Sequence, residues 1–184
     1  MSTRRRALFL DRDGVVNVDH GYVHKPEQFE FIEGIFELCN KAVELNYLII
    51  IITNQAGIGR GYYTEQQFHD LTKWMCREFS IRNINIDHVY FCPYHAEYGV
   101  GKYKKESIFR KPGPGMILQA ADEYDLDLGN SILVGDKETD MTAGTVAGVG
   151  CNLLYCAEPS GNIGNMSGVE IIEDLSEIEE YLVA

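Results

Sequence analysis

The stretch that decides the fold is Ala7–Asn17, ALFLDRDGVVN, in which a short apolar run stops abruptly at charged residues. A four-residue apolar run bounded by charge is typical of the end of a buried strand. Side chains at i and i+2 of a strand share a face, so Asp11 and Asp13 are expected to point into one space. Gly14 then lets the backbone turn away sharply. Two carboxylates held together in this way repel each other unless a cation or a proton lies between them.

Such a pair of carboxylates suits a Mg²⁺ site that holds a phosphate, with one carboxylate as nucleophile and the other as acid and base. The competing interpretation is an ordinary charged loop after a strand, because the DRDG motif is only four residues long. Residues elsewhere in the chain are needed to distinguish the Mg²⁺ site from the charged loop.

The composition indicates a globular protein of 184 residues, with 45% hydrophobic and 24% charged residues. This length fits one domain over residues 1–184, without a second independent core. The longest strongly apolar stretch, Tyr47–Ile52, is too short to cross a bilayer. The N-terminal region lacks the apolar segment of a signal peptide, so we expect a cytoplasmic protein that does not associate with membranes.

A net charge of −12 argues against nucleic acid as a partner, because phosphate backbones require a basic surface. Five of the sixteen basic residues nevertheless lie within residues 102–111, where they could bind a small anion. A solvated basic loop is the alternative, and it is the favoured one for residues 102–105. The five cysteines include no CxxC pair, which favours reduced thiols without disulfides.

Strand and helix patterns alternate along the chain, which predicts an α/β fold: a three-layer, Rossmann-like parallel sheet with helices on both faces. The predicted strands are Ala7–Leu10, Tyr47–Thr53, His88–Phe91, Ser131–Val134 and Gly150–Leu154. The predicted helices are Ile35–Leu45, Glu65–Phe79, Gly115–Tyr124, Asp140–Val146 and a terminal one over Leu175–Leu182. Thr64 and Gln67 form a predicted capping box, and Glu158–Gly168 is a predicted surface loop.

Polar residues follow three of the predicted strands at the point where each strand ends. The first strand ends at Asp11, the second at Thr53–Gln55 and the fourth at Gly135–Lys137. The carboxyl ends of parallel strands meet at one edge of the sheet, which is where ligands bind in such folds. The sequence therefore predicts one polar site at this edge.

The residues at this edge match the needs of phosphoryl transfer, which are a nucleophile, a metal ion and donors for the remaining charge. Asp11 is the candidate nucleophile that forms an aspartyl-phosphate, and Asp13 the candidate acid and base. Thr53 offers a hydroxyl to the phosphoryl oxygens, and Lys111 supplies a compact positive charge. Together with Asp11 and Asp13, Asp136 is expected to complete the Mg²⁺ shell.

Each of these assignments has a simpler competitor. Thr53 could cap the end of its strand, and a lone lysine such as Lys111 is more often solvated, although the two prolines that follow would orient it. Asp140 is a supporting carboxylate in the phosphoryl-transfer interpretation. It could equally be a helix-start acid favoured by the helix dipole.

Four motifs, DRDG, ITNQ, RKP and GDKETDM, occur in this order and resemble the haloacid-dehalogenase-like phosphatase superfamily. The resemblance extends from Leu8 to about Leu154. In that superfamily an aspartate two positions after the nucleophile marks phosphatases and phosphotransferases, and Asp13 occupies that position. No insertion is large enough for a separate cap domain, so the resemblance implies an open site shaped by loops.

Residues 19–26, DHGYVHKP, and residues 54–64, NQAGIGRGYYT, resemble the D-glycero-D-manno-heptose 1,7-bisphosphate 7-phosphatase family. That family produces heptose 1-phosphate for nucleotide-activated heptose, which is used in lipopolysaccharide or other surface glycans. This resemblance implies that Arg110 recognises the second phosphate, because a guanidinium group can bind a phosphate through two parallel hydrogen bonds. The implied substrate-binding residues are Asp19, His20, Gly21, Tyr22, Thr53, Asn54, Gln55, Ala56, Arg110, Lys111 and Lys137.

One segment departs from this family. Relatives often carry a zinc loop, Cys-x-His followed by Cys-x-Cys, whereas this chain has Cys92-Pro-Tyr-His95 and then Ser107-Ile-Phe109. Structural zinc requires four nitrogen or sulfur ligands, and two cannot close the site. We therefore expect no zinc, and a 102–109 loop that packing alone holds in place, with Phe109 as an apolar anchor.

Three other functions remain open at this point. Histidinol-phosphate phosphatases share the DRDG and ITNQ layout, although Gly21–His24 favours the heptose substrate. A non-catalytic phosphosugar-binding protein would not need both a nucleophile and an acid. A nucleic-acid 3′-phosphatase is opposed by the negative charge. Nothing in the sequence demands more than a monomer.

Overall fold

The fold is built around one parallel sheet, as the sequence predicts. The computed structural model describes residues 4–157 and 167–183. The sheet has six strands in the order β3-β2-β1-β4-β5-β6, and each neighbouring pair is parallel. The strands are β1 Arg6–Leu10, β2 Tyr47–Asn54, β3 His88–Cys92, β4 Ile132–Gly135, β5 Cys151–Tyr155 and β6 Val169–Ile172.

The main helices lie where the hydrophobic pattern places them. The α-helices are α1 Ile35–Glu44, α2 Ala56–Gly59, α3 Glu65–Ser80, α4 Gly115–Tyr124 and α5 Glu138–Ala147. The 3-10 helices are η1 Pro26–Gln28, η2 Gly101–Tyr103, η3 Leu128–Asn130 and η4 Leu175–Glu180. The predicted terminal helix is thus a shorter 3-10 helix that does not reach Leu182. The sequence reasoning missed α2 and β6, which are only four residues long, and most of the predicted 158–168 loop lies outside the described residues.

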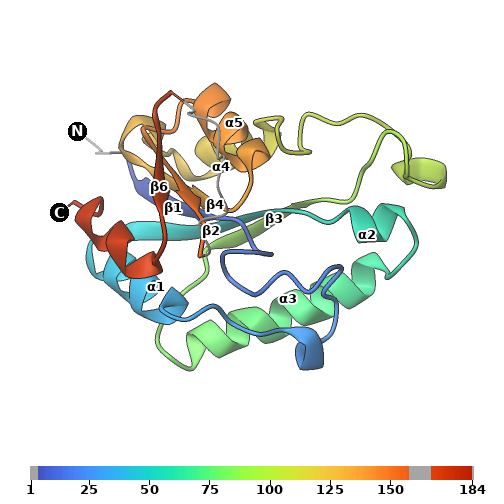
Figure 1. The fold of residues 1–184 in the computed structure, drawn as a ribbon, viewed down its shortest axis with the longest axis horizontal. Coiled ribbons are helices and arrows are strands. Elements are labelled where there is room, and N and C mark those ends of the chain that lie inside the picture. Colours follow the sequence, from blue (N-terminus) through green and yellow to red (C-terminus); the bar gives the residue numbers. More distant parts are fainter. Residues whose placement is uncertain (1–3, 158–166, 184) are drawn as a thin grey trace.

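The neighbouring strands β1 and β2 bury both of their faces, because helices cover the sheet on each side (Figure 1). Leu8 and Ile49 point to the side of α1, α3 and η4. Phe9 and Ile50 point to the side of α4 and α5. This alternation explains why β1 and β2 are apolar at every position of the run, a pattern typical of parallel sheets covered on both faces. Each fully buried side chain of this size contributes about 1.5–3 kcal/mol.

The longest helix, α3, begins at the capping box that the sequence predicts. The Thr64 hydroxyl accepts the Gln67 N–H at 3.1 Å, and the Gln67 side chain accepts the Thr64 N–H at 2.9 Å. These two bonds satisfy donors that a helix start otherwise leaves unpaired. Within the described part of the chain, no helix has the length and apolarity that crossing a bilayer requires.

The expectation that packing alone holds residues 102–109 was wrong, because hydrogen bonds hold the segment between β3 and α4, Tyr103 included. The Tyr103 hydroxyl donates a hydrogen bond to the Glu65 carboxylate in α3. The Val100 N–H donates to the Gly59 carbonyl at 2.8 Å. His95 Nδ1 accepts two backbone N–H groups at 3.2 Å each. Hydrogen bonds to α2 and α3 therefore anchor this segment beside the carboxyl edge of the sheet.

Candidate active site

A cavity of about 220 Å³ lies at the carboxyl edge of the sheet, outside the ends of β1 and β2. It brings together most of the residues that the sequence singles out. Those that line it are Asp11, Asp13, Asp19, Gly21, Tyr22, Thr53, Asn54, Gln55, Ala56, Arg110, Lys111 and Lys137. The convergence predicted from the strand ends is therefore present in the fold.

Two predicted residues do not line this cavity. His20 is exposed, and its Nε2 lies 3.0 Å from the Glu30 carboxylate. Asp136 lies beside the cavity, with its carboxylate near those of Asp11 and Asp140. Conversely, Tyr63 and Thr139 line the cavity although the sequence reasoning gave them no role.

Two glycines let the acidic side chains gather. Gly14 has a φ of +102°, and a Cβ at this position would lie 2.2 Å from Asp136 Oδ2. A Cβ on Gly135 would lie 2.3 Å from the Cβ of Asp140. Only glycine permits both approaches, since any side chain would displace a carboxylate.

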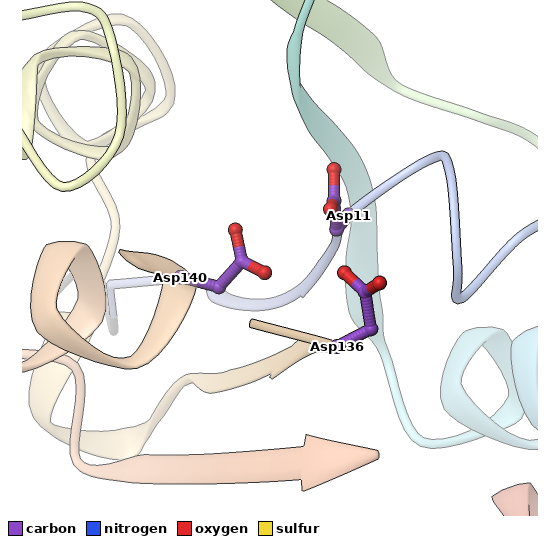
Figure 2. A group of neighbouring side chains, drawn as sticks. All are labelled: Asp11, Asp136 and Asp140. Atoms are coloured by element: carbon purple, nitrogen blue, oxygen red, sulfur yellow. The ribbon is translucent and has the colours of Figure 1, made fainter. Parts of the chain in front are cut away.

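Three carboxylates form the group most suited to a metal ion in the described residues. Asp11, Asp136 and Asp140 come from the ends of β1 and β4 and the first turn of α5, and their carboxylates turn toward a common space (Figure 2). One oxygen from each lies within 4.8 Å of the others. Asp136 Oδ1 is buried without a hydrogen-bond partner. Carboxylate oxygens are the ligands that Mg²⁺ prefers, so these residues fit the ion.

Burial and mutual repulsion set the charge state of this group. Burial raises the pKa of Asp11 well above its usual value, against the opposing effect of Lys111, and Asp140 raises it further. Burial likewise raises the pKa of Asp136, while Lys137 lowers it. A divalent cation among these carboxylates would favour their ionised forms.

Lys111 lies inside this acidic group. Its Nζ is 2.8 Å from Asp11 Oδ1 and 2.7 Å from Asp140 Oδ1, and it donates to the Ile52 carbonyl at 2.9 Å. Burial by itself lowers the pKa of Lys111, but Asp11 and Asp140 together raise it above its usual value. The ammonium group is therefore charged, and the solvated-lysine alternative does not apply.

Asp13 lines the same cavity as Asp11 but has different partners. Its Oδ1 accepts from Arg12 at 2.8 Å and from Asn17 at 3.1 Å. Its Oδ2 accepts from the Gln55 amide at 2.9 Å. The Asp13 side chain is not part of the three-carboxylate group, in which Asp140 takes the third place. Its role as a metal ligand stays a prediction.

Arg12 holds Asp13 in place, a contact that the sequence reasoning missed. It is 1% exposed, and the Nη2 atom that holds Asp13 also donates to the Val23 carbonyl at 2.8 Å. The guanidinium lies over the rings of Phe29 and Phe68. A charged residue between two aspartates carries no signal of such burial in the sequence. Its partners become visible only once the chain folds.

One side of the cavity carries the guanidinium group of Arg110, and that of Arg60 lies nearby. The pKa of Arg110 is lowered by burial and by the nearby positive charge of Arg60. Arg60 lies over the Tyr98 ring at 4.5 Å. Neither arginine has an ion pair with a carboxylate in the part of the chain that the structure describes. This side of the cavity can therefore accept an anion.

Lys137 joins two walls of the cavity. Its Nζ lies 3.2 Å from Asp19 Oδ2 and 3.1 Å from Asp136 Oδ2. Burial lowers its pKa, but Asp136, Asp11 and Asp19 raise it above the usual value. The contact links the loop over residues 19–22 to the start of α5.

The chain is similar to known phosphatases over nearly its whole length. The HAD-hydrolase-like family model matches residues 108–155. A D-glycero-alpha-D-manno-heptose-1,7-bisphosphate 7-phosphatase from Burkholderia mallei is 55% identical, with 91% of this chain and 89% of the relative covered. The corresponding beta enzyme from Vibrio cholerae is 44% identical, with 96% of each covered.

A solved structure is similar in fold as well as in sequence. The D,D-heptose 1,7-bisphosphate phosphatase from B. bronchiseptica, complexed with magnesium and phosphate, aligns with a TM-score of 0.82 and 28% identity. The alignment covers 96% of this chain and 97% of that one. With its Rossmann-like sheet, its acidic site and relatives of this identity and coverage, the chain belongs to the D-glycero-D-manno-heptose 1,7-bisphosphate 7-phosphatase family of haloacid-dehalogenase-like phosphatases.

Proposed function

We propose that this protein hydrolyses the C7 phosphate of D-glycero-D-manno-heptose 1,7-bisphosphate and releases heptose 1-phosphate, the precursor of nucleotide-activated heptose for surface glycans. One observation carries the proposal. Asp11 lies in the cavity at the end of the central strand, in contact with Lys111 and beside two further carboxylates. The identity to the B. mallei and V. cholerae enzymes supports the choice of sugar.

In the first step, the Asp11 carboxylate attacks the phosphorus atom and forms an aspartyl-phosphate. The bond from phosphorus to the sugar oxygen breaks, and Asp13 delivers a proton to that oxygen. Lys111 and the Thr53 hydroxyl compensate the charge on the phosphoryl oxygens. Both side chains line the cavity beside Asp11 and are almost fully buried, so they are already in place before the substrate binds.

In the second step, Asp13 removes a proton from water, and the resulting hydroxide attacks the aspartyl-phosphate. Phosphate leaves, and Asp11 is regenerated. The contacts of Asp13 with Arg12 and Gln55 hold its carboxylate at the cavity wall through both steps. A bound Mg²⁺ would supply positive charge that offsets the carboxylates and the phosphoryl group of the substrate. Asp11 and Asp136 would hold the ion, with Asp140 in support.

The second phosphate of the substrate is bound by Arg110, which lines the same cavity. Its guanidinium has a planar set of donors that matches a phosphate, and no carboxylate among the described residues neutralises it. The residues from Asp19 to Tyr22 and from Thr53 to Ala56 line the sugar between the two phosphates. His20 contributes through the backbone of its loop, since its ring is paired with Glu30.

The same proposal covers the organisation of the molecule. It includes a single domain over residues 1–184, which is supported by the joining of β1 and β6, from near the two ends of the described chain, in one sheet. We further propose a monomer in the cytoplasm that binds neither nucleic acid nor membranes. The net charge of −12 supports the absence of nucleic acid, and the cysteines, which form no disulfide in the described part of the chain, support the cytoplasm.

Phosphate release from a panel of substrates tests the proposal. The panel contains both anomers of heptose 1,7-bisphosphate, since the relatives carry both names, with histidinol phosphate, fructose 1,6-bisphosphate and a 3′-phosphorylated oligonucleotide. We expect a Mg²⁺-dependent preference for a heptose bisphosphate that EDTA removes. A preference for histidinol phosphate would keep the chemistry and overturn the substrate. No release from a folded protein would favour a phosphosugar-binding protein.

A further inference from the structure

Tyr63 lines the cavity but has no role in the steps described above. Its side chain is 5% exposed, and its hydroxyl donates a hydrogen bond to Gln55 Oε1. Burial raises the pKa of Tyr63 above its usual value, so the hydroxyl remains protonated and can act as a donor.

The Gln55 amide faces two residues of the proposed reaction. Its Nε2 donates to Asp13 Oδ2 at 2.9 Å and to Thr53 Oγ1 at 2.8 Å. The oxygen and nitrogen ends of an amide have nearly the same shape, so its partners decide which end points where. Asp13 Oδ2 accepts a hydrogen from the amide nitrogen, and Tyr63 supplies the donor that Oε1 needs. Asp13 and Tyr63 thus favour this orientation of Gln55, whereas the Thr53 hydroxyl could pair with either end of the amide.

This orientation determines what Thr53 can do. Because Thr53 Oγ1 accepts a hydrogen bond from Gln55, its own hydroxyl hydrogen is free to point to a phosphoryl oxygen. With the amide reversed, Gln55 Oε1 would accept that hydrogen and would also face the Asp13 carboxylate, oxygen to oxygen. Asp13 would then lose a hydrogen-bond donor, and Thr53 would lose the hydroxyl hydrogen that it offers to the phosphoryl group.

The Tyr63 ring is itself held firmly. It stacks on the His24 ring with parallel planes and centroids 5.1 Å apart. The ring also packs closely against Gly57, because a Cβ on Gly57 would lie 2.2 Å from it. His24 follows the 19–22 loop that lines the sugar, and its Nδ1 lies 2.8 Å from the Tyr22 carbonyl. Tyr63 therefore connects that loop to Gln55.

We propose that Tyr63 is a positioning residue for the reaction: through Gln55 it orients Asp13 for proton transfer and keeps the Thr53 hydroxyl available to the phosphoryl group. The inference rests on the proposed phosphatase chemistry but not on the identity of the sugar. It extends the set of functional residues into the segment between α2 and α3.

The test compares two kinds of leaving group in Tyr63→Phe. A sugar alkoxide needs a proton from Asp13 as it leaves, whereas 4-nitrophenolate leaves without one. The value of kcat/KM reports the steps up to the departure of the leaving group. We expect kcat/KM to fall at least tenfold more for the best primary sugar phosphate than for 4-nitrophenyl phosphate. Because both substrates meet the same enzyme sample, partial unfolding would not alter this ratio.

Three further variants make the result specific. Tyr62→Phe is the matched control, because Tyr62 is the neighbouring tyrosine and is 57% exposed; it should leave the ratio unchanged. Asp13→Asn should show the largest change in the ratio. In a Gln55→Met background, Tyr63→Phe should have no additional effect on the ratio, because the connection is already broken.

An equal loss on both substrates would reduce Tyr63 to a structural residue and overturn the proposal, as would an unchanged enzyme. A full effect of Tyr63→Phe in the Gln55→Met background would also overturn it, since the action would then not pass through Gln55. If Asp13→Asn changes no ratio, the acid role of Asp13 is wrong and the inference falls with it. Absence of heptose bisphosphate activity alone would affect only the choice of sugar.

Discussion

Lys111 Nζ lies 2.8 Å from Asp11 Oδ1, and both side chains are almost fully buried. The two residues are 100 positions apart in the sequence, and the pair forms because β1 ends where the segment before α4 crosses the edge of the sheet. Two opposite charges out of water are stable only with good geometry and further hydrogen bonds. Asp140 and the Ile52 carbonyl provide those contacts for the ammonium group.

Replacement of this lysine should harm stability and activity together. Lys111→Met leaves Asp11 and Asp140 close together without their counter-charge, and breaking a buried pair costs about 3–5 kcal/mol. Urea unfolding in EDTA measures the stability, and phosphate release measures the activity. Lys104→Met is the matched control, because Lys104 is exposed. Equal stability of the two variants would contradict the buried-pair interpretation.

Asp11→Asn should abolish turnover and preserve the fold. The amide is a poor nucleophile, but it has nearly the same shape as the carboxylate and removes one charge from a crowded acidic group. Phosphate release and circular dichroism check the two halves of the prediction. Asp122→Asn, on the exposed surface of α4, serves as the control for an amide substitution. Normal activity in Asp11→Asn would rule out the aspartyl-phosphate mechanism.

Asp13→Asn should slow the reaction by about 10²–10⁴-fold, the usual contribution of general acid–base catalysis. Both the protonation of the sugar oxygen and the hydrolysis of the aspartyl-phosphate depend on this carboxylate. Rapid-quench measurement of the phosphorylated enzyme should show that it forms slowly from a sugar phosphate. From 4-nitrophenyl phosphate it should form readily and then persist. Rapid turnover of the phosphorylated enzyme would show that another residue acts as the base.

Arg110→Ala should weaken the preference for a bisphosphate. Hydrogen bonds to charged groups contribute about 1.5–3 kcal/mol, which corresponds to roughly a 10- to 150-fold rise in KM for the bisphosphate. A monophosphate with only the reacting phosphate should be nearly unaffected, because it does not reach this side of the cavity. Arg110→Lys should restore part of the affinity but not the bidentate geometry. An equal rise in KM for both substrates would contradict this role.

Mg²⁺ should stabilise the folded protein. An ion at 100 times its Kd adds about 2.7 kcal/mol when it binds only the folded state. For a chain of this length that corresponds to a rise in Tm of roughly 5–10 °C. Thermal melting with Mg²⁺ and with EDTA measures the difference, and KCl at equal ionic strength is the control. Asp136→Asn should remove most of the effect, and an undiminished shift in this variant would place the ion elsewhere.

The order of the elements could be predicted from the sequence because local patterns determine it. The apolar runs at residues 7–10 and 47–53 are too short for helices and apolar at every position, as strands covered on both faces must be. The capping box at Thr64 starts α3 with only local hydrogen bonds. The polar residues after the strands had to meet, since all strands of a parallel sheet end at the same edge. The three principal site residues Asp11, Thr53 and Asp136 follow from this rule.

Contacts between distant segments could not be predicted in the same way. Nothing in the DRDG motif distinguishes Arg12 from an ordinary surface charge. In the structure Arg12 is buried against Phe29 and Phe68 and holds Asp13. His20 matches the motif of its family, but its ring pairs with Glu30 outside the cavity. The sequence did not distinguish whether Asp140 is a supporting carboxylate or a helix-start acid. In the structure Gly135 leaves space for Asp140 to approach the other two carboxylates.

The sequence by itself determined the parallel sheet, the edge at which its polar residues collect and the residue types that phosphoryl transfer needs, because strand periodicity and short motifs act over a few neighbouring positions. Only the tertiary structure decided the partners of those residues. The contact of Lys111 with Asp11 and the chain of hydrogen bonds from Tyr63 through Gln55 to Asp13 depend on where separate loops cross the sheet edge. The direction of a hydrogen bond and the burial of a charge are properties of that packing, and no local pattern encodes them.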